Sequence, residues 1–474
     1  MAGRIGRARE SLRIRRSERA GRPDNRLAPA DQALLAEHYA AGMSVVIQVC
    51  WIYEHPVDLD TVRRFHHDLG QGLLGRRIER PALPFARHHW VEDRIPSTLD
   101  IAARARPRGE VSDWLDERSQ LPVDPESGPG WHLGVAPFTD GSTGVSLVLS
   151  HNLIDGLGLA IVIIEAALGK TRDLGYPPPL SRTRWRGLVE DARLTAKDLP
   201  EVARALATGA KLARKQARER RSNPRPAAAR PVAVRGAGSG RAGDDVVLVP
   251  AISIYIDLDE WDARAEVLGG ASHTLAAALA AKLGERIGRR RPDDGVVTLQ
   301  VPISDRTEDD TRAMALSYAR VSVDPAALTT NLREVRAAIK QTLKALKETP
   351  DPAKAMLWLS SFAPKRSLKR LVARMPADPD QPVFCSYLGD LPSIIGCPDG
   401  TVAEFENARG TGQHESRQFL DQIGGRMIVL SGRINGKIFI SVGAYQPGAK
   451  NTKAALRELA AETIAEFGLT GVID

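Results

Sequence analysis

A stretch rich in proline, glycine, alanine and arginine divides the chain into two parts of similar size, and this division limits the folds that the sequence can adopt. The stretch covers residues 222–245 of the 474, and its composition is typical of a linker. The flanking parts, 28–221 and 246–474, are each long enough to form a domain with its own hydrophobic core. We therefore expect two domains joined by this linker.

Both parts alternate β-branched apolar runs with helical patterns, which is typical of a layered α/β architecture. An Asn-Gly pair at 435–436 predicts a tight hairpin between two strands. The expected strands are Ser44–Tyr53, Trp131–Phe138, Thr143–Ser150, Ala251–Leu258, Val296–Ile303, Ala319–Val323, Pro382–Leu388, Arg426–Ser431 and Lys437–Val442. The expected helices are Asp31–Ala41 with Asp31 as its N-cap, one from about Asp58, Leu157–Leu168, Ser181–Arg221, Ser272–Ile287, Asn331–Glu348, Ala353–Ala373 and Asn451–Phe467.

The net charge of +8 is concentrated in two segments. Residues 1–22 carry eight arginines against two glutamates, a net charge of +6, and residues 211–241 carry ten lysines or arginines against one glutamate, a net charge of +9. The rest of the chain is therefore acidic, which argues against a nucleic-acid surface built into the folded body. Residues 1–27 read as a disordered basic tail, and the basic segments suit an anionic membrane surface.

The sequence favours a cytoplasmic protein that can bind peripherally at the inner membrane face. No apolar run approaches the length of a transmembrane helix, and the basic N-terminus lacks the apolar core of a secretory signal. The three cysteines are too few for a disulfide scaffold, and their spacing is not that of a zinc site.

The segment 145–168 carries the residues with the clearest chemical meaning. An apolar strand runs into His151, which is followed by Asp155, Gly156 and an apolar helix. A histidine at the rim of a sheet is a natural general base near neutral pH. Asp155 could orient the imidazole or could anchor the loop through an arginine, and Gly156 permits a tight turn.

A His-x-x-x-Asp-Gly sequence at a strand-to-helix turn resembles the active-site signature of the CoA-dependent acyltransferase superfamily. This superfamily includes chloramphenicol acetyltransferase-like enzymes, condensation domains of peptide synthetases, and bacterial wax ester synthase/diacylglycerol acyltransferases. The chain is most similar to the last group, from about residue 28 to 470. The segments 121–133, Val301–Arg306 and Ser386–Asp390 carry the rest of the resemblance.

This resemblance implies two chloramphenicol acetyltransferase-like α/β domains that form a V with a tunnel between them. Acyl-CoA would be the co-substrate, a long-chain alcohol or diacylglycerol would be the acceptor, and no metal or bound cofactor would be needed. His151 would remove the proton of the acceptor. Asp155 would be structural and would pair with Arg306, while Gly156 would keep the space beside the base clear.

Two positions depart from the family pattern. Ser150 stands where many wax ester synthase-type members have a first histidine, and the asparagine expected near residues 386–389 is missing. A donor to the oxyanion or the substrate would then come from Ser386, Tyr387 or a backbone N–H near Gly389. The alternatives are a condensation-type or secondary-metabolite acyltransferase of the same fold, and a catalytically silent lipid-binding homologue.

The remaining histidine pairs are expected to be structural. The pair at 66–67 lies on an amphipathic helix without the carboxylate spacing of the motif. The pair at 88–89 has no third metal ligand nearby, which favours an ordinary strand.

Overall fold

The computed structural model describes residues 24–42, 44–95, 97–222, 246–348, 354, 357–362, 370 and 377–474. Most of the expected tail (1–27), of the expected linker (222–245) and of the expected helix Ala353–Ala373 lies outside these residues. The last residues of the tail are an exception, since Leu27 is fully buried and Arg26 forms an ion pair with Asp198. The folded body therefore includes residues that the sequence pattern assigns to the tail.

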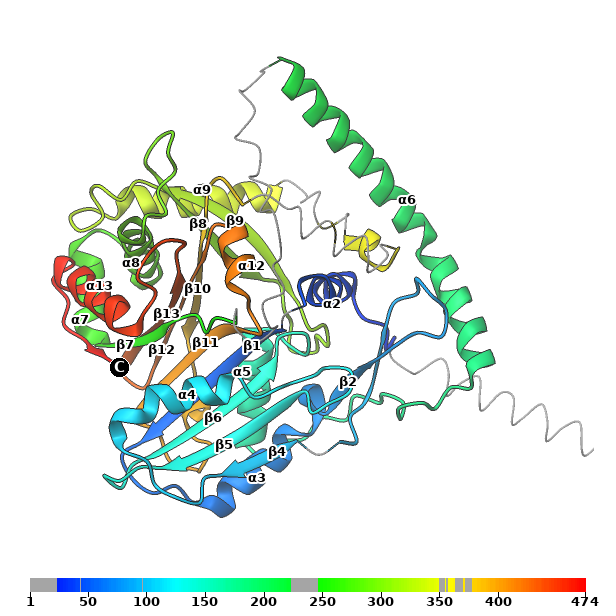
Figure 1. The fold of residues 1–474 in the computed structure, drawn as a ribbon, viewed down its shortest axis with the longest axis horizontal. Helices are drawn as coiled ribbons and strands as arrows, with labels where there is room; N and C mark the ends of the chain where they lie inside the picture. Colours follow the sequence, from blue (N-terminus) through cyan, green and yellow to red (C-terminus); the bar gives the residue numbers. More distant parts are fainter. Residues whose placement is uncertain are drawn as a thin grey trace, which may run out of the picture.

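Two large sheets form the centre of the described part of the chain (Figure 1). The strands of the N-terminal half are β1 (Ser44–Tyr53), β2 (Arg76–Glu79), β3 (His89–Glu92), β4 (Thr98–Ile101), β5 (Trp131–Pro137) and β6 (Thr143–Ser150). Those of the C-terminal half are β7 (Ala251–Asp257), β8 (Val297–Ser304), β9 (Leu316–Val323), β10 (Val383–Asp390), β11 (Phe405–Gln413), β12 (Arg426–Ile434), β13 (Lys437–Tyr445) and β14 (Val472–Ile473). The strand orders are β11-β1-β6-β5-β4 and β14-β7-β13-β12-β10-β8-β9.

Helices pack on these sheets and complete the layers that the sequence predicts. The N-terminal helices are α2 (Pro29–Ala41), α3 (Leu59–Leu69), α4 (Val111–Ser119), α5 (Gly156–Ala167) and α6 (Arg184–Ser222). The C-terminal ones are α7 (Leu258–Val267), α8 (Ser272–Ile287), α9 (Arg333–Glu348), the short 3-10 helix η3 (Leu357–Phe362), α12 (Arg417–Gln422) and α13 (Lys453–Glu466). None of the described helices has the length and apolar content that a membrane crossing needs.

Strand β11 joins the two halves, because it comes from the C-terminal half but belongs to the N-terminal sheet. It runs antiparallel to β1, from the pair Ser44–Gln413 to the pair Ile52–Phe405. The sequence pattern does not predict this strand, since FENARGTGQ contains two glycines and mostly polar residues. The C-terminal part 246–474 thus contributes one strand to the sheet of its neighbour.

The buried core of the N-terminal half also continues into the C-terminal half. Side chains of β1, α3 and α5 pack in one cluster with Ala313, Ile395, Ile434 and Phe439 of the other half. A shared strand and a shared core hold the two halves in one arrangement, so a cavity between them has a defined shape.

Asp31 forms a second link between the halves, which corrects its predicted role as an N-cap. Helix α2 begins at Pro29, a favoured first residue, with Ala28 at the N-cap. The buried carboxylate of Asp31 instead accepts hydrogen bonds from the backbone N–H groups of Ala313 (3.0 Å) and Met314 (2.8 Å). Asp31 therefore holds a loop of the C-terminal half against α2.

We expect Asp31→Ala to lower the free energy of unfolding by about 3 kcal/mol, because it leaves two buried N–H groups without their acceptor. The matched control is Asp60→Ala, which removes another first-turn carboxylate whose side chain is 79% exposed. Urea unfolding followed by circular dichroism measures both effects. Equal losses in the two variants would contradict the proposed link.

Candidate active site

A cavity of about 580 Å³ lies between the two halves and is lined by residues of both. Its wall is mostly apolar. Several strands bury one face in a core and turn the opposite face, which also carries apolar side chains, toward the cavity. On β12, Ile428 and Leu430 line the cavity, while Val429 between them packs into the C-terminal core. Such a cavity is of the size and polarity that small-molecule sites have.

His151 is the only histidine among the described residues that line this cavity. It follows the last residue of β6, where its backbone N–H donates a hydrogen bond to the carbonyl oxygen of Val45 at 2.9 Å. Burial lowers the pKa of His151, although Asp155 and the backbone at residues 151 and 154 favour the charged form. The Nδ1 atom is buried and makes no hydrogen bond with the described residues. The imidazole is therefore neutral near pH 7, as a general base must be.

Asp155 forms a buried, two-point ion pair with Arg306 across the boundary of the two halves. The Nε atom of Arg306 donates to Oδ1 at 2.9 Å and Nη2 donates to Oδ2 at 2.8 Å. The N–H groups of Gly158 and Ala315 donate to the same carboxylate, each at 2.9 Å. The carboxylate is thus the N-cap of α5 and has four donors, which is the structural role and the arginine partner that the resemblance implies.

Arg306 also organises the loop that follows β8. Its guanidinium donates to the carbonyl oxygens of Asp310 (3.1 Å), Arg312 (2.9 Å) and Ala313 (3.0 Å). The side chain is 2% exposed and that of Asp155 is fully buried. The ion pair therefore fixes the start of α5 and this loop at the same time.

The structure gives Gly156 and Gly158 different roles. A β-carbon on Gly156 would lie 3.6 Å from the nearest atom, in Leu388, and the backbone of Gly156 does not need the left-handed conformation. A β-carbon on Gly158 would lie 2.6 Å from Ile154 and 3.0 Å from the guanidinium carbon of Arg306. Gly158, which the sequence pattern did not single out, makes room for the ion pair, while Gly156 lines the cavity.

The residues expected on the substrate side, Ser386, Tyr387 and Gly389, lie on β10 and face different surroundings. Ser386 lines the cavity. Tyr387 also lines the cavity; its ring packs partly against the C-terminal core, and its hydroxyl lies 3.1 Å from the Oγ atom of Ser272. Gly389 has a φ of 80° at an irregularity of the strand, which only glycine adopts easily. Ser386 and Tyr387 are therefore both placed where a ligand in the cavity could contact them, and the Tyr387 hydroxyl already has a partner in Ser272.

Buried charged residues, among them Glu406 and Arg289, add polar surface to the cavity wall. Glu406 accepts a hydrogen bond from the amide of Asn435, and burial raises the pKa of Glu406 to about 7. Burial and the nearby Arg426 lower the pKa of Arg289 to about 10. The sequence pattern missed both residues, because a charged residue in a polar segment reads as a surface residue until the topology is known.

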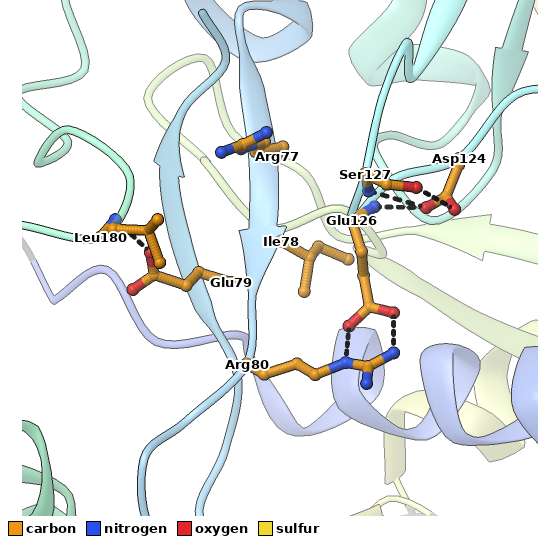
Figure 2. Close-up of a pocket in the computed structure, with 8 residues that line it drawn as sticks. All are labelled: Arg77, Ile78, Glu79, Arg80, Asp124, Glu126, Ser127 and Leu180. Atoms are coloured by element: carbon orange, nitrogen blue, oxygen red, sulfur yellow. Dashed lines mark hydrogen bonds and ion pairs between the residues drawn. The ribbon is translucent and has the colours of Figure 1, made fainter. Parts of the chain in front are cut away.

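A second, open hollow of about 330 Å³ lies on the surface beside β2 (Figure 2). Most of its charged groups have partners: Arg80 donates to Glu126 at 2.9 and 3.0 Å, and Glu79 accepts from the N–H of Leu180 at 2.6 Å, whereas Arg77 contacts none of the other side chains drawn. Because most of these groups already have partners and no described histidine lines the hollow, it is a weaker candidate for chemistry than the cavity at His151.

Other described histidines have structural partners, as the sequence pattern favours. His89 lies 3.1 Å from the carboxylate of Asp191. His132 accepts a hydrogen bond from Arg118 at 2.9 Å, and burial together with this cation lowers the pKa of His132 to about 4. Within the described ranges, no three histidine, cysteine, aspartate or glutamate side chains gather in a way that could hold a metal ion.

Comparison with known proteins shows the fold. No family model and no curated protein sequence matches the chain. A condensation domain of the calcium-dependent antibiotic synthetase, in complex with a substrate analogue, superposes with a TM-score of 0.54 at 14% identity, over 94% of this chain and 96% of that one. The wax ester synthase/diacylglycerol acyltransferase of Marinobacter aquaeolei VT8 superposes with a TM-score of 0.50 at 14% identity, over 93% and 98%. The chain has their two-domain α/β fold. The predicted fold class is thereby confirmed.

We expect Gly158→Ala to lower the free energy of unfolding by about 2 kcal/mol, because the added methyl group collides with Ile154 and the arginine of the ion pair. Gly156→Ala, two residues away on the same helix, should change it by less than about 1 kcal/mol. Thermal and urea unfolding of both variants measure the difference. Equal stability of the two variants would contradict the prediction, because it would mean that a methyl group at residue 158 fits beside Ile154 and Arg306 without a collision.

Proposed function

We propose that the protein is an acyltransferase that moves an acyl group from an acyl-CoA thioester to an alcohol, with His151 as the general base. The observation that supports it most directly is the position of His151 in the wall of a large, mostly apolar cavity between the two halves, where burial lowers the pKa of its imidazole. The fold adds support, because it is shared with a condensation domain and a wax ester synthase/diacylglycerol acyltransferase.

The proposed reaction needs one base and no covalent enzyme intermediate. His151 removes the proton of the acceptor hydroxyl while the oxygen attacks the thioester carbonyl carbon. The tetrahedral intermediate then collapses, the C–S bond breaks and CoA leaves as a thiolate, which takes the proton from the imidazolium. A thiol has a pKa near 8.5, with cysteine as the reference, so its expulsion needs little help from an acid. Ser386 on the cavity wall is the candidate donor to the oxyanion.

The paired carboxylate of Asp155 supports this assignment of roles. Its oxygens accept from Arg306 and from two backbone N–H groups, so it has no free side from which to take a proton in the reaction. The base is then His151 alone, and Asp155 acts by placing the loop. Acyl-CoA is the proposed co-substrate, and the apolar wall suits an alkyl chain on either reactant, as in a long-chain alcohol or diacylglycerol.

The two alternative functions differ from the proposed one in their substrates and in whether any reaction takes place. A condensation-type enzyme of the same fold would prefer an amine and a carrier-bound thioester, whereas a silent lipid-binding protein would retain a lipid without turnover. Measuring free CoA release with alcohols and with amines, and with CoA-bound and carrier-bound thioesters, separates the three.

We expect His151→Ala to lower kcat for acyl transfer by about 100- to 10,000-fold, the usual contribution of a general base. His67→Ala is the matched control, because His67 is exposed on α3 and lies away from the cavity. Acceptor-dependent release of CoA from an acyl-CoA measures both rates. Unchanged turnover in the His151 variant would exclude the proposed mechanism.

We expect the acid limb of the kcat/KM profile to have its midpoint below pH 6.5. The neutral imidazole is the active form, and burial lowers the pKa of His151 below the ordinary value of 6.5. The active form therefore persists as the pH falls through 6.5 and is lost only at more acidic values. A midpoint at or above pH 6.5, measured with the stable folded enzyme, would contradict a buried catalytic imidazole.

A further inference from the structure

Helix α6 is attached to the protein in the reverse of the usual orientation. It runs along one side of the molecule, and its C-terminal part extends away from the body (Figure 1). Most helices at a protein surface bury an apolar face and expose a polar one. Buried carboxylates together with Val202 and Ala205 attach α6 to the body, while its largest apolar side chains, such as Trp185, face water.

The inner face of α6 is held by two buried aspartates. Asp191 accepts from the N–H of Ala82 at 2.7 Å and from Arg182 at 2.9 Å. Asp198, one heptad later, forms ion pairs with Arg26 (3.1 Å) and Arg87 (3.0 Å). These contacts determine which side of α6 faces the body, and the opposite side is therefore exposed.

The outer face carries a continuous apolar stripe. Its positions are alternately four and three residues apart, the spacing that keeps side chains on one side of a helix. The stripe consists of Trp185, Val189, Ala192, Ala196, Leu199, Ala203, Leu206 and Ala210, all exposed. The large side chains Trp185, Val189, Leu199 and Leu206 are 75%, 55%, 54% and 59% exposed, respectively. A contiguous exposed patch of this kind marks an interaction surface.

The charges beside the stripe indicate what it binds. The exposed basic residues are Arg184, Arg186, Arg193, Lys197, Arg204, Lys211, Arg214 and Arg218. Among the described side chains of α6, Glu190 is the single exposed acidic one. A partner must therefore accept an apolar stripe and complement many positive charges. A second copy of the helix would bring two such cationic faces together, which disfavours a coiled coil.

The parts of the chain outside the described residues do not supply this complement. By sequence, residues 1–22 have a net charge of +6, residues 223–245 carry four arginines against two aspartates, and residues 349–376, of which 354, 357–362 and 370 are described, carry six lysines or arginines against Asp351. A segment with a surplus of positive charge is a poor match for a basic surface. The complementary partner is thus anionic and external.

We propose that the outer face of α6 docks on the surface of an anionic lipid bilayer. The large apolar side chains enter the boundary between head groups and acyl chains, while the basic side chains contact the lipid phosphates. A bilayer supplies both the apolar layer and the negative charge along the whole length of the stripe.

A chain of contacts leads from α6 to one wall of the cavity. Helix α6 contacts η3, and η3 contacts α2 (Figure 1). Two residues of α2, Leu34 and Glu37, line the cavity. Docking through α6 would thus bring the element that forms this wall close to a membrane, where a lipid acceptor is found. This consequence rests on the proposed function, whereas docking itself does not.

The test is co-sedimentation of the full-length protein with vesicles of phosphatidylcholine alone or of phosphatidylcholine with phosphatidylserine. We expect binding to the anionic vesicles only, weakened by added salt. The triple variant Val189→Glu, Leu199→Glu, Leu206→Glu should bind them about tenfold more weakly or not at all. Glutamate is a good helix former at exposed positions, and circular dichroism verifies that the variant folds.

The matched control places three glutamates at other exposed valines. Val267, Val402 and Val472 are 74%, 46% and 59% exposed and lie outside α6, and their glutamate variant should bind the vesicles nearly as the wild type does. Unchanged binding by the α6 variant would overturn the proposal, because the basic segments alone would then explain it. A wild type that binds no anionic vesicles, or one that dimerises through the stripe instead, would also overturn it. His151→Ala should bind normally, which separates docking from the proposed chemistry.

Discussion

The buried ion pair of Asp155 and Arg306 is the constraint on which the rest of the site depends. It joins the first turn of α5 in one half to the loop after β8 in the other. Removing two charges from water is costly, and a buried pair is tolerated only when further hydrogen bonds satisfy its remaining atoms. Two backbone N–H groups and three carbonyl oxygens do so here. The pair therefore adds to the shared strand and the shared core a contact between the halves directly beside the cavity.

The same ion pair controls the electrostatics of His151. A carboxylate that faced the imidazole would favour the imidazolium form and raise the pKa of the ring. Because Arg306 and two N–H groups neutralise Asp155, its influence on the histidine is smaller than that of burial, and the pKa of His151 is lowered. Burial thus keeps the base neutral, and the ion pair fixes the start of α5 beside it.

The parts that could be predicted from the sequence are those governed by local pattern. The strands Ser44–Tyr53 and Thr143–Ser150 and the helix Ser272–Ile287 have the predicted bounds, since apolar periodicity and capping act over a few residues. The parts that could not be predicted depend on partners far away. Asp31 resembles an N-cap, but its acceptor role is decided by N–H groups 282 and 283 positions along the chain. Strand β11 is polar, and only its place beside β1 makes it a strand.

Helix α6 shows the same limit in a different form. Its existence and its basic character follow from the sequence, but the side that faces the body does not. Hydrophobicity alone predicts that Trp185 and Leu199 face the body and that Asp191 faces water. In the structure, Trp185 and Leu199 are exposed and Asp191 is buried. The reason is that Asp191 finds an arginine and two backbone N–H groups on the body, and a buried carboxylate with such partners can outweigh the gain from burying a thin stripe that contains several alanines. Polar anchoring of this kind leaves the apolar side of a helix free for a partner outside the chain, and the surrounding positive charge selects which partner that is.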